Sequence, residues 1–284
     1  GLYYHFRIII DPNDIKLMIE VKDLKKKFGD TEVLKGISTS FETGKVNLII
    51  GQSGSGKTVF LKSLLNVYEP SSGTILFDER DVTKLSREEK QSLRAEIGTV
   101  FQGGALFDSL TVEENITFPL DMFTNLTFRE KKRRAREVMD SVHLEGASRK
   151  FPAEISGGMQ KRVAIARAIV NNPKYLFCDE PNSGLDPYTS NVIDDLLIEI
   201  TQQYNTTTII NTHDMNSVMT IGEKIVYLKD GLLEWEGNKD NVITAKNENL
   251  IDFVYSSELF KELREYFLST DKTSIDNIKP KENE

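Results

Sequence analysis

The chain has few of the features that mark secreted or membrane-spanning proteins. It contains one cysteine in 284 residues, which excludes an intrachain disulfide and fits a reducing compartment. This residue, Cys178, lies in an apolar run, and we expect it to be a small buried hydrophobic residue. No uninterrupted apolar segment approaches the roughly 20 residues that a transmembrane helix needs. The first residues lack a charged segment followed by an apolar one, so we expect no signal peptide. These absences predict a cytoplasmic protein that would act on a membrane only through partners.

An excess of positive charge is also absent. The formal net charge is −8, which gives no support for nucleic-acid binding. Of the three histidines, His5 and His143 lie in no recognisable motif, and we interpret both as surface residues. The hydrophobic content of 39% is enough for one substantial α/β core with an inserted lobe.

The most informative segment follows residue 50. Residues 46–50 form an apolar run that predicts a buried strand, and residues 59–65 have helical spacing. A glycine-rich turn lies between them and consists of Gly51, Gln52, Ser53, Gly54, Ser55, Gly56, Lys57 and Thr58. This order is typical of a P-loop, whose backbone N–H groups surround a phosphate at a helix N-terminus. Glycines also occur in plain strand–helix connectors, but not with this full pattern.

A second strand, residues 175–178, ends in two acids that suit phosphate chemistry. Ligands of α/β sheets bind beyond the carboxyl ends of the strands, so both strand ends should share one crevice. We expect Lys57 to reach the β- and γ-phosphates, and Thr58 and Asp179 to hold Mg²⁺. Glu180 is placed to act as the general base for an attacking water. The alternative is that the acid pair only caps the following loop.

A third motif precedes the helical run over residues 161–169. Ser156 is a natural N-cap, and Gly157 and Gly158 leave backbone amides open to an anion. With Gln160, these residues resemble the signature motif of ABC ATPases. Further matches to that family lie between residues 18 and 235 and occur in the order that the family has. Phe28 stands where the family stacks an aromatic ring on adenine. Gln102 matches the glutamine of the Q-loop, Asp186 the aspartate of the D-loop and His213 the switch histidine.

The resemblance implies a fold, a mechanism and cofactors. The fold would be an α/β P-loop NTPase with a RecA-like core sheet, an antiparallel β-lobe and an inserted helical subdomain. ATP and Mg²⁺ would lie between one subunit's P-loop and the signature motif of a twin subunit, in a head-to-tail homodimer. Lys57, Gln102, Glu180 and His213 would be catalytic, and Gln102 would also contact Mg²⁺. The remaining contacts to the nucleotide would come from the P-loop and from Phe28, Ser156, Gly157, Gly158, Gln160 and Asp186.

The same patterns divide the chain. We expect residues 1–17 to be an N-terminal extension, either native or added in cloning, and residues 18–235 to form the ATPase domain. Within this domain, residues 19–50 alternate as strands do, which predicts that they form the antiparallel lobe. The helical subdomain is expected at about residues 103–160, a helical extension at 236–268 and a disordered tail at 269–284. The apolar residues of the extension fall at helical spacing: Leu250, Ile251, Phe253, Val254, Leu259, Phe260, Leu263 and Phe267. They would either bind a twin subunit or a regulatory partner, or pack on their own domain.

Residues 104–109, Gly-Ala-Leu-Phe-Asp-Ser, resemble the ATPases of MCE-type lipid transporters, the group that includes the maintenance-of-lipid-asymmetry system. This implies phospholipid as cargo, an integral membrane permease, an MCE-domain lipid-binding component and a place on the cytoplasmic face of the inner membrane. Leu106 and Phe107 would contact the permease, or lie in the subdomain core. The alternative is the ATPase of an amino-acid-type importer or a lipoprotein-release system.

Two other classes fit less well. Soluble ABC ATPases of DNA repair or translation carry long coiled coils or two ATPase units, which this chain lacks. A nucleotide sensor without turnover would not need both Glu180 and His213.

Residues 129–136 are strongly basic. We interpret this run as a solvated helix face, with anionic lipid headgroups or the permease as the alternative contact.

Overall fold

The structure is a computed structural model that describes residues 17–256, 261–262, 264–266 and 269. The predicted N-terminal extension and polar tail therefore lie outside the described residues, except for Leu17 and Ser269. So do Leu259, Phe260, Leu263 and Phe267 of the apolar C-terminal pattern. The proposed domain boundaries stay predictions, and one strand, Leu232–Gly237, crosses the boundary expected at residue 235.

The first of two sheets is antiparallel and has the order β2-β1-β4-β5. Its strands are β1 (Leu17–Phe28), β2 (Thr31–Glu42), β4 (Ser72–Phe77) and β5 (Arg80–Asp81). The β1–β2 turn uses Gly29 at φ 57°, a left-handed conformation that glycine adopts without steric cost. We expected the antiparallel lobe to include all of residues 19–50. The structure corrects this, because residues 46–50 join the other sheet and β4 and β5 complete the lobe.

The second sheet has six strands in the order β10-β9-β3-β8-β7-β6. The pairs β9–β3, β3–β8, β8–β7 and β7–β6 are parallel, and only β10 is antiparallel to its neighbour. The bounds are β3 (Val46–Ile50), β6 (Ile97–Val100), β7 (Tyr175–Asp179), β8 (Thr207–Asn211), β9 (Lys224–Lys229) and β10 (Leu232–Gly237). Every residue of β3 and β8 is buried, as expected for strands covered on both faces. The predicted α/β fold with a parallel core sheet is confirmed.

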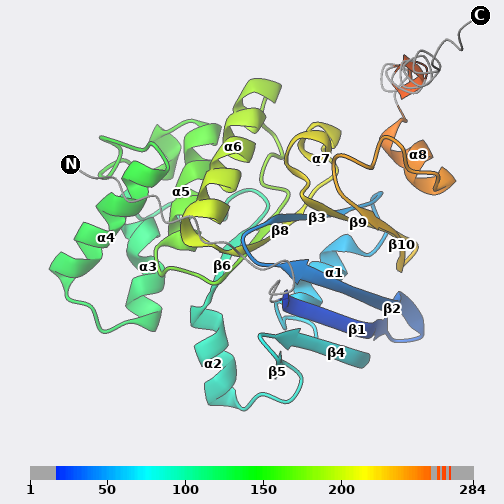
Figure 1. Ribbon diagram of the computed structural model, residues 1–284. Coiled ribbons are helices and arrows are strands. Elements are labelled where there is room, and N and C mark those ends of the chain that lie inside the picture. Colours follow the sequence, from blue (N-terminus) through cyan, green and yellow to red (C-terminus); the bar gives the residue numbers. More distant parts are fainter. Residues whose placement is uncertain (1–16, 257–260, 263, 267–268, 270–284) are drawn as a thin grey trace, which may run out of the picture.

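The helices surround this sheet (Figure 1). Helices α3, α4 and α5 lie on the side away from the four-stranded sheet, and α3 packs against the other two. In the described part of the chain, no helix combines the length and apolar character needed to cross a bilayer. The helical bounds are α1 (Lys57–Leu64), α2 (Arg87–Ala95), α3 (Val112–Phe123), α4 (Phe128–Ser141), the 3₁₀ turn η1 (Pro152–Glu154), α5 (Gly157–Ile169), α6 (Pro187–Tyr204), α7 (Met215–Ile221) and α8 (Glu248–Val254).

Strand β7 shows how the two cores are separated. Successive side chains of a strand point to opposite faces. Leu176 and Cys178 therefore enter the core shared with α3, α5 and α6, whereas Tyr175 and Phe177 enter the core beneath the antiparallel sheet. Cys178 is fully buried, and burial raises the pKa of its thiol. Its predicted role as a small buried hydrophobic residue is confirmed.

A polar network ties the antiparallel sheet to the edge of the core sheet. The Tyr175 hydroxyl donates to Asp78 Oδ2 at 2.7 Å. The Arg80 guanidinium donates to both carboxylate oxygens of Glu96, at 3.0 and 2.8 Å, and to the Tyr175 hydroxyl at 3.2 Å. Paired charge-assisted hydrogen bonds of this kind are stronger than neutral ones. They fix the β4–β5 hairpin against the start of β6.

We expect Tyr175→Phe to lower the free energy of unfolding by about 1–3 kcal/mol, since Asp78 and Arg80 lose a buried partner. Tyr188→Phe is the matched control, because Tyr188 is 79% exposed whereas Tyr175 is fully buried. Urea unfolding of both variants measures the difference. Equal stability of the two variants would show that the network contributes nothing.

Candidate functional site

The P-loop connects β3 to α1. Gly51, Gly54 and Gly56 have φ values of 154°, 82° and 105°, and the last two lie in the region that favours glycine. A side chain at Gly51 would place its Cβ 2.4 Å from the Leu228 carbonyl oxygen, so the loop packs tightly against β9. The loop ends at Gly56, the N-cap of α1, where no side chain caps the helix, and an uncapped helix N-terminus suits an anion.

Lys57 extends back along this loop. It is only 9% exposed, and its Nζ donates to the carbonyl oxygens of Gly51 at 2.6 Å and Gln52 at 3.1 Å. Burial lowers the pKa of the Lys57 ammonium, while the carboxylates of Glu180 and Asp179 act in the opposite direction. The hydroxyl of Ser55 is also buried and has no hydrogen-bond partner within the described residues. A buried cation and a hydroxyl without a partner, both at the start of a helix, are groups that suit a bound phosphate, as predicted for this loop.

The acidic side of the site comes from the ends of β7 and β8. The Asn211 amide donates to Asp179 Oδ1 at 3.2 Å, and the Glu180 amide donates to the Asn211 carbonyl at 2.9 Å. Glu180 has a left-handed φ of 50°, which is costly for a residue with a side chain and occurs mainly at functional sites. His213 Nδ1 lies 2.9 Å from Glu180 Oε2. The predicted general base and the predicted switch histidine are thus in hydrogen-bond contact.

One cavity of about 700 Å³ brings these elements together. It contains predicted residues from four separate segments: the P-loop residues Gly51, Gln52, Ser53, Gly54, Gly56, Lys57 and Thr58, together with Gln102, Asp179, Glu180 and His213. The sequence placed the P-loop, the acid pair and His213 after predicted strands, and the structure brings them together at one cavity with Gln102. Their individual roles stay predictions.

The other predicted residues lie outside this cavity. The Phe28 ring, 43% exposed, makes an edge-to-face contact with Tyr68 at 5.2 Å. Ser156 caps α5 by accepting from the Met159 amide at 3.2 Å. Gly157 and Gly158 lie in the first turn of α5, and Asp186 caps α6. Ser55 of the P-loop is buried and does not line the cavity.

Gln160 does not face the cavity either. Its side-chain amide donates to the Pro152 carbonyl at 2.9 Å, which fixes η1 against α5. This contact lies within the chain and uses one N–H of the Gln160 amide, whose second N–H and carbonyl oxygen could still make the predicted nucleotide contact.

Comparison with known proteins decides the family. Residues 34–183 match the family described as ABC transporter. The chain belongs to this family. A solved structure of the ATP-binding cassette MJ0796, a dimer in a post-hydrolysis state bound to ADP and Pi, shares 34% identity and a TM-score of 0.71, covering 78% of this chain and 99% of that one.

Relatives of this ABC ATPase domain carry different transport names. The probable ribonucleotide transport ATP-binding protein mkl of Mycobacterium leprae is 38% identical, over 80% of this chain and 65% of its own length. The methionine import ATP-binding protein MetN 2 of Oceanobacillus iheyensis is 36% identical, over 80% and 67%. The intermembrane phospholipid transport system ATP-binding protein MlaF of Haemophilus influenzae is 33% identical, over 84% and 90%. The chain thus spans less than two thirds of the mkl relative.

Sequence reasoning missed several residues around the site of this ABC ATPase. Lys161 of the α5 helix is 6% exposed, and its Nζ has no hydrogen-bond partner in the described chain. Burial lowers the pKa of Lys161, and the Glu180 carboxylate acts in the opposite direction. Val33, Met215, Phe253 and Ser256 also line the nucleotide cavity. Asn211, which holds Asp179, stands two residues before His213, and this position is a local signal that could have identified it.

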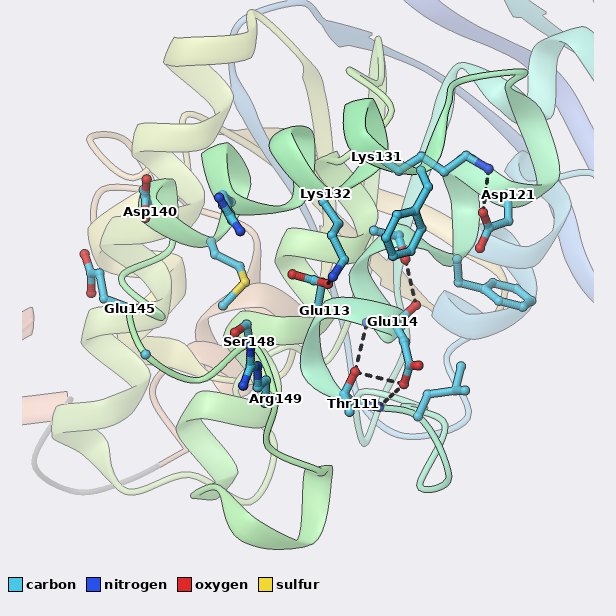
Figure 2. Close-up of a pocket in the computed structure, with 17 residues that line it drawn as sticks. Thr111, Glu113, Glu114, Asp121, Lys131, Lys132, Asp140, Glu145, Ser148 and Arg149 are labelled. Carbon is cyan, nitrogen blue, oxygen red and sulfur yellow. Dashed lines mark hydrogen bonds and ion pairs between the residues drawn. The ribbon is translucent and has the colours of Figure 1, made fainter.

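A second cavity, of about 790 Å³, lies between α3, α4 and the loop before η1. Figure 2 shows Lys131 and Lys132 of the basic run directed toward acids of α3. Lys131 pairs with Asp121 at 2.6 Å and Lys132 with Glu113 at 3.2 Å. An anionic headgroup would compete with these internal pairs, so the contacts favour a solvated helix face over a lipid-binding surface.

A buried carboxylate connects the D-loop to the helix that follows His213. Asp194 of α6 accepts from the Asn182 amide at 2.7 Å and from the Ser217 hydroxyl at 2.6 Å. Burial raises the pKa of Asp194 to about 6, although the two donors act to lower it. Because the folded pKa lies above the ordinary value of 3.8, protonation favours the folded state. This stabilising contribution is complete below the ordinary pKa and is lost as the pH rises through 6.

We therefore expect the melting temperature of the wild type, relative to that of Asp194→Asn, to fall between about pH 4 and about pH 7. Glu199→Gln, at an exposed position of the same helix, is the control and should follow the pH dependence of the wild type. Thermal unfolding at both pH values measures this difference in melting temperature. A pH-independent difference between the wild type and Asp194→Asn would contradict the raised pKa.

Proposed function

We propose that this chain is the ATP-hydrolysing subunit of an ABC transporter. The observation that carries the proposal is the 2.9 Å contact of His213 with Glu180 in the same cavity as the P-loop Lys57. A nucleotide-binding module without turnover has no need of an oriented base beside its phosphate site.

The side chains fit ATP with Mg²⁺. Three oxygen-containing side chains that could bind the ion line one cavity: the Thr58 hydroxyl, the Gln102 amide and the Asp179 carboxylate. Within the described residues, no group of three or more His, Cys, Asp or Glu side chains could hold a metal ion by itself. This suits Mg²⁺, which is commonly bound by one or two carboxylates together with substrate phosphates. When bound, the ion neutralises charge on the phosphate oxygens.

Different residues of the chain would then carry out different parts of ATP hydrolysis. The Lys57 ammonium and the P-loop amides hold the β- and γ-phosphates and stabilise the charge that develops on them. The Glu180 carboxylate accepts a proton from the attacking water. His213 donates from Nδ1 to Glu180 and keeps its carboxylate directed into the cavity.

We further propose a head-to-tail homodimer. Ser156, Gly157 and Gly158 begin α5 outside the chain's own cavity, so a γ-phosphate bound there would have to come from a second copy. The likeness to the dimeric MJ0796 cassette supports this arrangement. Dimer closure would depend on the γ-phosphate, because hydrolysis removes the anion that both subunits bind.

We expect Glu180→Gln to keep ATP binding while its steady-state hydrolysis falls about 10²- to 10⁴-fold. Since the γ-phosphate persists, the variant should also accumulate as a dimer in ATP, which size-exclusion chromatography would detect. Glu199→Gln, a change at an exposed position on α6, is the control. Undiminished hydrolysis by Glu180→Gln would remove Glu180 from the role of base.

An apolar groove beside the Q-loop is our proposed docking site for a membrane permease. A cavity of about 310 Å³ is lined mainly by apolar side chains, among them Phe101, Phe107, Phe118 and Met122. Phe107 is 42% exposed and Met122 58% exposed. Leu106 is partly buried and packs on the core, so of the two predicted contacts Phe107 is the one available to a helix of the permease.

We propose phospholipid as the cargo, with an MCE-domain protein in the complex at the cytoplasmic face of the inner membrane. Residues 104–109 and the similarity to MlaF over 90% of its length support this. The similarity to MetN 2 and mkl supports the alternative of a small-solute importer. A lipoprotein-release system is a further alternative, which the relatives described above do not favour.

Co-purification from membranes, with Glu180→Gln in ATP as bait, would test both proposals. We expect a permease, an MCE-domain protein and phospholipid to be recovered. Adding Met122→Glu should reduce recovery of the permease at least about tenfold, because a charge buried in an apolar contact is costly. Leu126→Glu is the control, since Leu126 is 38% exposed but lies outside the groove. A solute-binding protein in place of the MCE component would favour the importer, and the absence of any membrane protein would contradict both.

A further inference from the structure

Helix α8 is attached to the ATPase core by polar contacts at its start. Asn247 caps the helix by accepting from the Leu250 amide at 2.9 Å, and its side-chain amide donates to the Glu234 carbonyl of β10 at 3.1 Å. Asn249 receives a hydrogen bond from the Tyr227 hydroxyl at its carbonyl, at 3.1 Å, and its side chain accepts from the Lys229 ammonium. Three of these contacts join the start of α8 to β9 and β10, the strands beside which it lies in Figure 1.

The apolar face of α8 completes this attachment. Leu250, Val254 and Tyr255 are at most 3% exposed and belong to the same core as β3 and β7. The Phe253 ring stacks on the ring of Tyr227, with 5.3 Å between centroids and 25° between planes. The predicted alternative that the extension packs on its own domain therefore describes residues 248–255 in this structure.

The Tyr227–Phe253 stack reaches the P-loop through the sheet. Tyr227 pairs with Ile50, the last residue of β3, and Gly51 follows immediately. Phe253 and Ser256 line the same 700 Å³ cavity as Lys57, Glu180 and His213. The C-terminal segment of the chain therefore borders the site in which ATP binds.

We propose that α8 is a wall of the nucleotide pocket of its own chain, with Phe253 and Ser256 as determinants of nucleotide affinity. The Phe253 ring excludes water from one side of the pocket, which strengthens the attraction between the phosphates and Lys57. The Ser256 hydroxyl is exposed and provides a hydrogen-bond donor at the rim. The inference needs only that the domain binds ATP, and it is independent of the cargo.

Titration with Mg²⁺ and the non-hydrolysable analogue AMP-PNP tests this proposal. Phe253→Ala should weaken binding about 3- to 10-fold, the range expected for loss of an aromatic contact. Ile251→Ala is the matched control, because Ile251 packs on the core from the same helix but does not line the cavity. It should bind like the wild type. Equal affinities of the two variants would overturn the role of Phe253.

Ser256→Trp gives a second measurement that does not depend on core packing, because Ser256 is exposed. A bulky ring at the rim should weaken AMP-PNP binding without changing the melting temperature of the free protein. Wild-type affinity in this variant would show that Ser256 does not border the bound nucleotide. Lys57→Ala separates the two proposals: normal binding by Lys57→Ala would refute the phosphate site itself, whatever Phe253 does.

Mixed subunits distinguish a wall in the same chain from one supplied by a twin. Lys57→Ala chains retain Phe253 but should not bind nucleotide, while Phe253→Ala chains retain the P-loop. In a mixture with an excess of Lys57→Ala chains, only the pockets of the Phe253→Ala chains bind nucleotide. The proposal requires these pockets to keep the weakened affinity of Phe253→Ala. Recovery of wild-type affinity would mean that Phe253 acts across the dimer, which would overturn the assignment.

Discussion

The arrangement around the site depends on the burial of one ammonium group. Lys57 is held between two backbone carbonyls of its own loop and faces the carboxylates at the end of β7. A buried cation is tolerated only where acceptors and opposite charge compensate for lost hydration. The glycine-rich loop, the parallel order of β3, β8 and β7, and the strained backbone at Glu180 together satisfy that requirement. Phosphate binding follows from the same arrangement.

The sequence predicted this centre well because its signals are local. A glycine-rich turn before Lys57, acids after an apolar strand and His213 after another each report a strand end, and parallel strands bring such ends together. Residues 46–50 were partly misassigned, because strand periodicity does not tell which sheet a strand joins. That choice depends on neighbours such as β8 and β9, which are distant in sequence.

Other parts of the site could not be predicted for a related reason. Phe253 and Ser256 reach the pocket only because Asn247 and Asn249 attach α8 to β9 and β10. Helical spacing identified an apolar face over residues 250–254, but not its partner. Similarly, the charge of residues 129–136 gave no indication that α3 supplies acids for Lys131 and Lys132. Contacts between distant segments are absent from any local pattern.

The alternating burial of β7 has a consequence for how the domain unfolds. One face of this strand belongs to the core beneath the antiparallel sheet and the other to the core beside α5 and α6. Neither core can lose its order while β7 stays in place for the other, so the two lobes should melt as one cooperative unit. Ligand binding at the end of that strand would then be transmitted to both lobes as a shift of a single transition.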